Sequence, residues 1–312
     1  RTKIVAKDPL TIGGKPVGSI RDAIRAWEAD IKYVENYIYD NNLEPGMMYE
    51  VKEGQLRRVE FSLAPETTAQ VDRLLQGESS EYRKLALEWM RLLECPVPTY
   101  LRAALDIEVF SPVATRIPDP EAADEEVICV SIVGSDGPKS VFLLRKEGKK
   151  NGNIPLPENA SIRFCETEKE LLAGVFIAMI AYPLVLTFNG DDFDLRYLYH
   201  RAQNLGFTRE EIPIEMGRDV AYLRHGVHVD LYKFFFNRSI QIYAFGQKYR
   251  ENTLGEVSEA ILSRGKMETS APVSELDYGE LAAYCLNDSQ INLELTKFND
   301  ELVMKLITPR SR

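Results

Sequence analysis

Two acidic side chains lie two residues apart in an otherwise apolar stretch of the sequence. In the segment 104–109 (ALDIEV), Asp106 and Glu108 alternate with apolar residues. Because successive side chains of a β-strand point to opposite faces, a strand here places both carboxylates on one face. Burying paired carboxylates without a counter-charge is costly, so the pattern indicates a bound divalent cation or a strongly raised pKa. The spacing alone is a weak signal, since it also occurs on solvated strand edges.

Two further groups of polar residues have the types and spacing of a site. The segment 189–194 (NGDDFD) passes from the end of an expected strand into an expected helix, and ligand sites in α/β sheets favour such strand ends. Tyr284 and Asp288 are four residues apart in a helical pattern, so they share one helix face. A core tyrosine beside an exposed aspartate is the simpler interpretation of that pair.

The elements that must position these groups follow from hydrophobic periodicity and from turn and capping residues. After residue 98 the pattern predicts strands at 101–109, 127–133, 140–144 and 184–188, an extended piece at 228–233, and helices at 195–205, at 253–262 and from about 277. Asp136-Gly137 predicts a hairpin between the second and third strands. Before residue 98 the hydrophobic pattern predicts a helix at 19–29, strands at 47–51 and 59–63, and a helix at 80–93.

One uncharged segment, 171–188, is long enough to raise the question of a membrane span. Pro183 interrupts it, and the residues that follow favour a strand. Thr167 and Glu170 form a capping box just before it, which is typical of soluble proteins. A buried helix followed by a buried strand fits better, and no membrane partner is predicted.

Length and composition indicate a globular protein of about two domains, with a predicted boundary at Pro96 and Pro98. The formal charge of −10 argues against binding a phosphate backbone by electrostatics alone. No zinc-type spacing joins the four cysteines, which are Cys95, Cys129, Cys165 and Cys285. We therefore expect reduced thiols and a cytoplasmic protein, and the charged start of the chain argues against a signal peptide.

Taken together, the three groups resemble the three exonuclease motifs of family B DNA polymerases in their order and in their strand and helix contexts. The surrounding sequence also resembles the archaeal, and particularly the crenarchaeal, members at 105–110 (LDIEVF), 186–195 (LTFNGDDFDL) and 229–237 (VDLYKFFFN). The resemblance covers essentially the whole chain. The polymerase palm motifs Ser-Leu-Tyr-Pro-Ser and Asp-Thr-Asp-Ser are absent from it.

The resemblance implies an α/β, RNase H-like (DnaQ-like) exonuclease fold with a mixed sheet at 99–312, which ends at the start of the link to a missing palm. Residues 1–98 would be an α+β remnant of the polymerase N-terminal domain, without its beginning. The implied activity is 3′→5′ proofreading during DNA replication. The implied partners are DNA with a single-stranded or frayed 3′ end and the remaining palm, fingers and thumb of the same enzyme.

The resemblance also implies a set of catalytic residues that work with two ions of Mg²⁺ or Mn²⁺, for which carboxylates are suitable ligands. Asp106 would bridge both ions, Glu108 and Asp288 would complete the first site, and Asp194 would hold the second. Tyr284 would orient the attacking water. The cations would also locally reverse the negative charge that otherwise repels DNA.

Two other residues match positions of the family that contact the single-stranded 3′ end. These are Asn189 and Phe193, although plain core packing explains Phe193 equally well. Two other functions stay open. The chain could be a template-binding or lesion-binding platform with little activity of its own, or a free-standing nuclease of the same superfamily that acts on RNA.

Several charged residues near the motifs receive a structural interpretation. Asp191 and Asp192 are expected in a solvated strand-end turn rather than as ligands. Asp230 is interpreted as structural, and the three histidines share no ligand spacing. A basic cluster is expected in a solvated loop rather than on phosphates: Arg145, Lys146, Lys149 and Lys150. Arg196 stands where the family often has proline.

Overall fold

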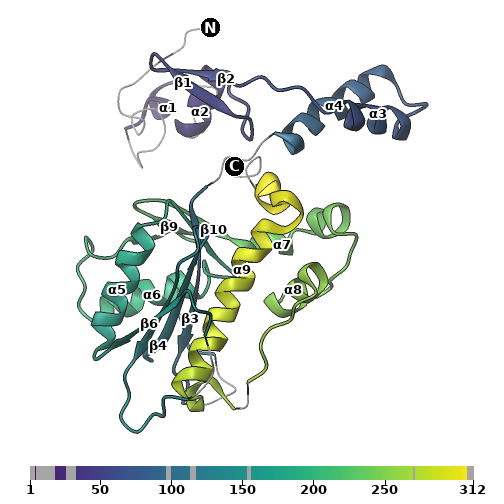
Figure 1. Ribbon diagram of the computed structural model, residues 1–312. Helices are drawn as coiled ribbons and strands as arrows, with labels where there is room; N and C mark the ends of the chain where they lie inside the picture. Colours follow the sequence, from purple (N-terminus) through teal and green to yellow (C-terminus); the bar gives the residue numbers. More distant parts are fainter. Residues whose placement is uncertain are drawn as a thin grey trace. The chain divides into compact units, whose positions relative to one another are not determined.

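The computed structural model describes residues 4, 18–25, 33–95, 100–112, 117–152, 156–269 and 271–307. They fall into two compact units, one within residues 1–96 and one within residues 97–307 (Figure 1). The boundary prolines Pro96 and Pro98 lie outside the described residues. The assignment of 1–98 to a polymerase N-terminal domain and of 99–312 to an exonuclease domain stays a prediction.

The described part of the first unit holds helices and one β-hairpin. The elements are α1 (Ile20–Ala23), α2 (Tyr33–Asp40), β1 (Tyr49–Lys52), β2 (Gln55–Arg58), α3 (Pro65–Leu74) and α4 (Ser80–Glu94). The helix predicted at 80–93 is confirmed as α4. Its N-cap is Ser79, whose hydroxyl accepts a hydrogen bond from the amide of Tyr82 at 3.1 Å.

Two predictions for this unit are wrong. No strand forms at 59–63, because the two residues Glu53 and Gly54 turn the chain with positive φ angles of 53° and 75° and pair Lys52 with Gln55. A two-residue turn fixes the register of the whole hairpin, and Glu-Gly is a weaker turn signal than Asn-Gly. The helix predicted at 19–29 ends at Ala23, and its last residues, 26–29, lie outside the described residues.

A six-stranded mixed sheet forms the centre of the second unit. Its strands are β3 (Arg102–Val109), β4 (Val127–Gly134), β5 (Lys139–Leu144), β6 (Ala160–Cys165), β7 (Leu184–Thr187) and β10 (Val227–Asp230). The order across the sheet is β10-β7-β3-β4-β5-β6. β4 runs antiparallel to its neighbours β3 and β5, whereas the other neighbouring pairs are parallel. The predicted Asp136-Gly137 hairpin joins β4 to β5, with Gly137 at φ 112°.

Helices cover both faces of this sheet. They are α5 (Glu168–Ile180), α6 (Asp194–Asn204), α7 (Leu231–Phe236), α8 (Leu254–Leu262) and α9 (Tyr278–Ile307). Shorter elements are the two-stranded β8 (Ile214–Met216) and β9 (Ala221–Leu223), a π-helical turn at Ile240–Ala244 and a 3₁₀ turn at Val273–Glu275. The extended prediction at 228–233 is wrong after Asp230. The Asp230 carboxylate accepts from the amide of Tyr232 at 3.0 Å and so caps α7.

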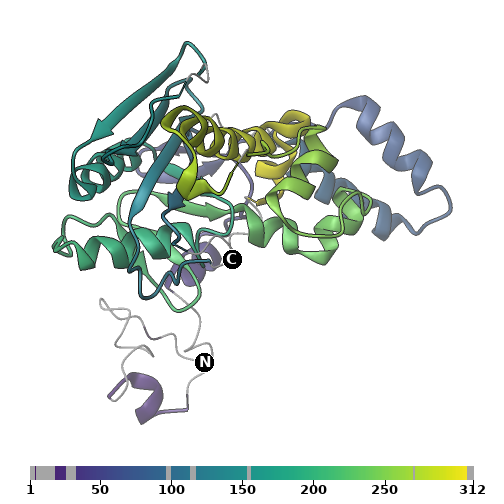
Figure 2. The same ribbon diagram turned by 90° about the horizontal axis from the view of Figure 1, so that it is seen from below.

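The two faces of the sheet have separate apolar cores. Helices α5 and α6 pack on one face, against the side chains of Leu105, Ile107 and Val109 among others. Helix α9 packs on the other face, against Ala104 and residues of β4 and β5. Both views show α9 (yellow) across the sheet from α5 and α6 (teal) (Figures 1 and 2). Side chains of even number on β3 therefore face α9.

The uncharged segment 171–188 forms the buried helix and strand predicted for it. Helix α5 begins after Thr167, whose hydroxyl accepts from the amide of Glu170 at 3.2 Å, and β7 follows at Leu184. Across the described part of the chain, every helix is too short or too polar to span a membrane.

Helix α9 is interrupted near its end. Residues Asn299, Asp300 and Glu301 have positive φ angles of 45°, 53° and 60°. Glu301 there accepts a hydrogen bond from the buried Arg102 guanidinium at 2.6 Å, and Arg102 Nε donates to Thr296 at 3.0 Å. Since Arg102 begins β3, these bonds tie the far end of α9 to the strand that carries the acidic pair.

Candidate active site

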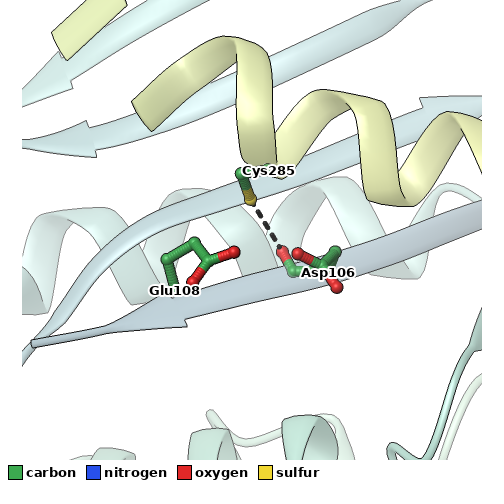
Figure 3. A group of neighbouring side chains, drawn as sticks. All are labelled: Asp106, Glu108 and Cys285. Carbon is green, nitrogen blue, oxygen red and sulfur yellow. Dashed lines mark hydrogen bonds between the residues drawn. The ribbon is translucent and has the colours of Figure 1, made fainter. Parts of the chain in front are cut away.

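The acidic pair lies on the α9 side of the sheet, as the alternation predicted. The other six residues of β3 are buried, whereas Asp106 and Glu108 are half-buried. The apolar residues that alternate with the two acids fill the core on the other face of the sheet. A shift of the strand's register by one residue would therefore bury both carboxylates in that core. The side chains point toward α9, where Cys285 lies between them (Figure 3).

Helix α9 brings Tyr284 and Asp288 to the same place. Asp288 is 2% exposed, and its Oδ2 lies 2.5 Å from the ammonium of Lys266. The same ammonium lies 5.4 Å from the centre of the Tyr284 ring. Asp288 is therefore a buried carboxylate with one cationic partner, and the interpretation as an exposed aspartate is wrong.

Lys266 is a site residue that sequence reasoning missed. It lies in the loop after α8, which ends at Ser263 with a left-handed φ of 52°. Arg264 fixes this loop along α9 by donating to Glu294 at 2.9 Å and to Asn287 at 2.7 Å. No motif or spacing in the sequence indicates that this loop turns back onto the acidic cluster.

Asp194 follows the strand end beyond β7 and lies close enough to the acidic pair for its charge to raise the pKa values of Asp106 and Glu108. It is the first residue of α6, 5% exposed, and a helix N-terminus favours a negative charge there. Before it, Asn189 holds a left-handed φ of 71°. Phe193 packs against the α5/α6 core, with its ring 5.7 Å from that of Tyr197. The core-packing interpretation of Phe193 therefore has a direct structural basis.

Burial raises the pKa values of all four carboxyl groups, and repulsion within the cluster adds to this effect for Asp106 and Glu108. For Asp106 burial is the largest cause, followed by the charges of Asp288 and Glu108, and its pKa lies well above the usual value. Burial and the Asp288 charge raise the pKa of Glu108 to about 8. Burial raises the pKa of Asp194 to about 7, and that of Asp288 rises for the same reason although Lys266 opposes it.

The donor atoms fit a divalent cation. Asp106 Oδ2 and Asp288 Oδ1 are both buried and accept no hydrogen bond from the described residues. A buried carboxylate oxygen without a donor is costly, and a hard cation satisfies it while lowering the repulsion within the cluster. The arrangement is thus a candidate site for a divalent cation.

Comparison with known proteins supports this interpretation. The model of the exonuclease domain of DNA polymerase family B matches residues 24–243. The chain belongs to this exonuclease-domain family. DNA polymerase 1 of Saccharolobus solfataricus is 43% identical over 313 residues, which cover 100% of this chain and 35% of that protein. DNA polymerase 1 of Sulfolobus acidocaldarius is 40% identical over 100% of this chain and 35% of its own length.

A third relative, DNA polymerase 1 of Aeropyrum pernix, is 42% identical over 98% of this chain and 32% of its own length. The chain thus spans about a third of the length of these curated relatives. The resemblance to archaeal, crenarchaeal-type family B polymerases is confirmed. The mixed sheet with helices on both faces likewise confirms the RNase H-like α/β fold that the resemblance implied.

In this exonuclease domain, the expectation of a solvated Asp191 is wrong. Asp191 is 3% exposed and pairs with Lys233 at 2.6 Å and with His228 at 3.3 Å. It also accepts from the amide of Ala221 at 2.6 Å, and these partners lower its pKa to about 2 against the effect of burial. Only Asp192 of the pair is exposed.

Asp230 has the structural role expected for it. Its carboxylate accepts from the amide of Asn189 at 2.7 Å and from the amide of Asp191 at 3.1 Å, besides capping α7. One buried side chain at the end of β10 thus holds the backbone of the loop that leads to Asp194.

Several other charged residues that the sequence singled out have protein partners. Arg196 donates to the carbonyl of Asp191 at 3.0 Å, and His200 lies 3.0 Å from Glu121. In the basic loop, Arg145 pairs with Glu166 at 2.8 Å and Lys146 pairs with Glu126. Two of its four charges are therefore neutralised, which favours the solvated-loop interpretation.

The raised pKa values predict that the metal-free domain becomes less stable as pH rises. The unfolded chain releases the Glu108 proton near pH 4.5, whereas the folded chain keeps it up to about pH 8. Between these values the folded state binds more protons, so the free energy of unfolding falls with increasing pH. Thermal melting in chelator should therefore give a lower Tm at about pH 8 than at about pH 5. Glu108→Gln should flatten this dependence, and a wild-type Tm that rises across the interval would contradict the assignment.

Proposed function

We propose that this exonuclease domain removes nucleotides from the 3′ end of DNA and so proofreads for a family B DNA polymerase. The observation that carries the proposal is the convergence of four carboxylates from three elements. They are Asp106 and Glu108 on β3, Asp194 on α6 and Asp288 on α9. A purely structural scaffold has no need for such a costly cluster.

The carboxylates would hold two ions of Mg²⁺ or Mn²⁺. Asp106, Glu108 and Asp288 are proposed as ligands of one ion, and Asp194 as a ligand of the second, with Asp106 shared. Such a pair supplies neutralisation of the charge that develops on the phosphate and on the leaving 3′-oxygen. The oxygen-only donor set of these four residues suits hard cations.

Tyr284 is proposed to hold the attacking water by its hydroxyl. The Lys266 ammonium lies against both the Tyr284 ring and Asp288. It therefore limits the positions that the phenol can adopt, and its positive charge favours the ionised form of Asp288. Lys266 is thus proposed as the residue that keeps the water-holding group beside its carboxylate.

The proposed substrate is a single-stranded or frayed 3′ end, because a recessed cluster is reached by a separated strand more readily than by a duplex. Asn189 is proposed to contact the terminal nucleotide, since the Asp230 bond holds its backbone at the loop before Asp194. Phe193 is proposed as a second contact through the exposed part of its ring. The remaining palm, fingers and thumb of the same polymerase are the proposed partners, with residues 1–98 as part of its N-terminal domain.

The direct test compares 3′ ends on matched DNA. The chain is incubated with Mn²⁺ and 5′-labelled duplexes that differ only in a paired or mismatched 3′ terminus. We expect faster shortening of the mismatched strand, because the paired terminus must first separate. Faster digestion of the paired end would contradict the substrate assignment. Preference for an RNA strand would favour a free-standing ribonuclease, and binding without shortening would favour a template platform.

Asp230 gives a second test because it acts through backbone hydrogen bonds on the loop before Asp194. We expect Asp230→Ala to lower the cleavage rate by about 10–100-fold and to raise the Mn²⁺ concentration needed for half-maximal rate. Asp230→Asn keeps one acceptor oxygen and should recover part of the loss. Asp192→Ala, an exposed carboxylate of the same loop, is the matched control and should change neither quantity. Equal losses of cleavage rate in Asp230→Ala and Asp192→Ala would show that the loop tolerates no substitution. That result would contradict the proposed positioning role of Asp230.

A further inference from the structure

A buried histidine lies between the loop that precedes Asp194 and the strands beside that loop. The side chain of His228, on β10, is 1% exposed. Its Nδ1 lies 3.2 Å from the carbonyl oxygen of Ala221 and 3.3 Å from a carboxylate oxygen of Asp191. Its Nε2 lies 2.8 Å from the hydroxyl oxygen of Thr187, the last residue of β7. The two ring nitrogens therefore contact three separate segments of the domain.

The partners of the ring fix which nitrogen carries the proton. The Ala221 carbonyl and the Asp191 carboxylate are acceptors, so Nδ1 must donate to them. The Asp191 carboxylate also pairs with the ammonium of Lys233 at 2.6 Å, so its charge is balanced without a second positive charge on a buried ring. Nε2 is then an acceptor, and the hydroxyl of Thr187 donates to it.

The Thr187 side chain packs against the turn at Asn189 and Gly190. Thr187 is fully buried, and a Cβ atom at position 190 would overlap its hydroxyl and methyl groups. Asn189 follows in the same turn with its left-handed φ of 71°, and its carbonyl accepts from the amide of Phe193 at 2.9 Å. A rotation of the Thr187 side chain would exchange the groups that touch Gly190 and so displace the turn. The bond to His228 selects one rotamer of Thr187.

We propose that His228 is a positioning residue that, through the Thr187 hydroxyl, holds Asn189 in the orientation that binds the 3′-terminal nucleotide. The inference rests on the contact between Asn189 and DNA in the proposed function. Its route differs from that of Asp230, which accepts hydrogen bonds from backbone amides of the loop. Because Asn189 is not a proposed metal ligand, loss of the His228 bond should weaken DNA binding rather than metal binding.

The first measurement needs no DNA. The ring nitrogens of the whole, metal-free chain are observed by ¹⁵N NMR near neutral pH, and the His228 signals are assigned as those that disappear in His228→Asn. We expect a proton on Nδ1 and none on Nε2. A proton on Nε2, in the other neutral tautomer or in the imidazolium, would overturn the proposal, because that nitrogen could not then accept from Thr187.

The second measurement is the affinity for a fluorescent single-stranded DNA, followed by anisotropy with Ca²⁺ in place of Mn²⁺. His228→Asn keeps an N–H group near the Nδ1 position but has no acceptor near Nε2, so we expect the Kd to rise about tenfold. His228→Gln places an amide oxygen near Nε2 and should recover most of the affinity. Thr187→Val keeps the shape of the side chain without the hydroxyl and should lose as much as His228→Asn, whereas Thr187→Ser should bind like the wild type.

The double variant separates positioning from general damage. His228→Asn combined with Thr187→Val should bind no more weakly than either single variant, because both remove the same hydrogen bond. His225→Asn, at an exposed histidine, is the matched control and should not change the Kd. If His228→Asn fails to fold, the comparison of Thr187→Val with Thr187→Ser decides the question.

Three results would overturn the inference: wild-type affinity in Thr187→Val, additive losses in the double variant, or no binding of DNA by the wild-type chain. A wild-type chain that binds the DNA but never shortens it in Mn²⁺ would contradict the proposed function alone. The expected pattern of affinities would still support the role of His228 in that case. The two proposals can therefore fail separately.

Discussion

Asp106→Ala should abolish measurable removal of 3′-terminal nucleotides by this chain. Asp106 stands at the centre of the acidic cluster, and the charges of Asp288, Glu108 and Asp194 all act on it. Its removal deletes the ligand proposed to be shared by both cations, so neither ion would keep its position. Single-turnover cleavage of a labelled mismatched DNA measures the loss, and calorimetry with Mn²⁺ should show weaker binding.

Asp106→Asn is the matched control for the fold in this experiment. It keeps the size of the side chain and removes only the negative charge. We expect it to be as inactive as the alanine variant while melting at or above the wild-type Tm in chelator, because repulsion within the cluster falls. Equal Mn²⁺ affinity in wild type and Asp106→Ala would mean that the cluster does not bind the metal.

Tyr284→Phe should give the second-largest loss, with cleavage reduced by about 10²–10⁴-fold but still measurable. The substitution keeps the ring against the Lys266 ammonium and removes only the hydroxyl. Water positioning would then fail while the carboxylates keep their places. Mn²⁺ affinity should therefore stay near the wild-type value, in contrast to Asp106→Ala.

Tyr278→Phe on the same helix is the control for loss of a phenol. Its hydroxyl accepts a hydrogen bond from the amide of Lys146 at 2.6 Å, away from the acidic cluster, so cleavage should not change. If Tyr284→Phe loses metal binding while Asp106→Ala still turns over, the two roles have been assigned the wrong way round.

The parts of the site that the sequence predicted follow from local periodicity. The alternation through Asp106 and Glu108 fixed their common face, because a one-residue slip would bury both acids in an apolar core. The capping residue Thr167 distinguished a soluble helix from a membrane span. Tyr284 and Asp288 share a face because the helix around them is regular for several turns.

The parts that the sequence did not predict depend on long-range contacts. Lys266 enters the cluster because Arg264 fixes its loop along α9, and no local pattern encodes that path. Asp191 was expected in solvent, but Lys233 and His228 come from a distant strand and helix to pair with it. The observed hairpin at residues 49–58 differs from the predicted strand positions, because the two-residue turn, rather than the hydrophobic pattern, sets which residues pair.

The positions of β3 and α9 in the chain bear on the order in which the site can appear during synthesis. Asp106 and Glu108 come from the first strand of the second unit, whereas Tyr284 and Asp288 come from its last helix. A nascent chain that has emerged only as far as β10 already contains all six strands of the sheet but neither α9 residue. Such a chain can begin to fold while it still lacks two of the residues proposed for cleavage. The ribosome therefore releases the strand-borne acids first, and the proposed metal site is completed only once α9 has emerged.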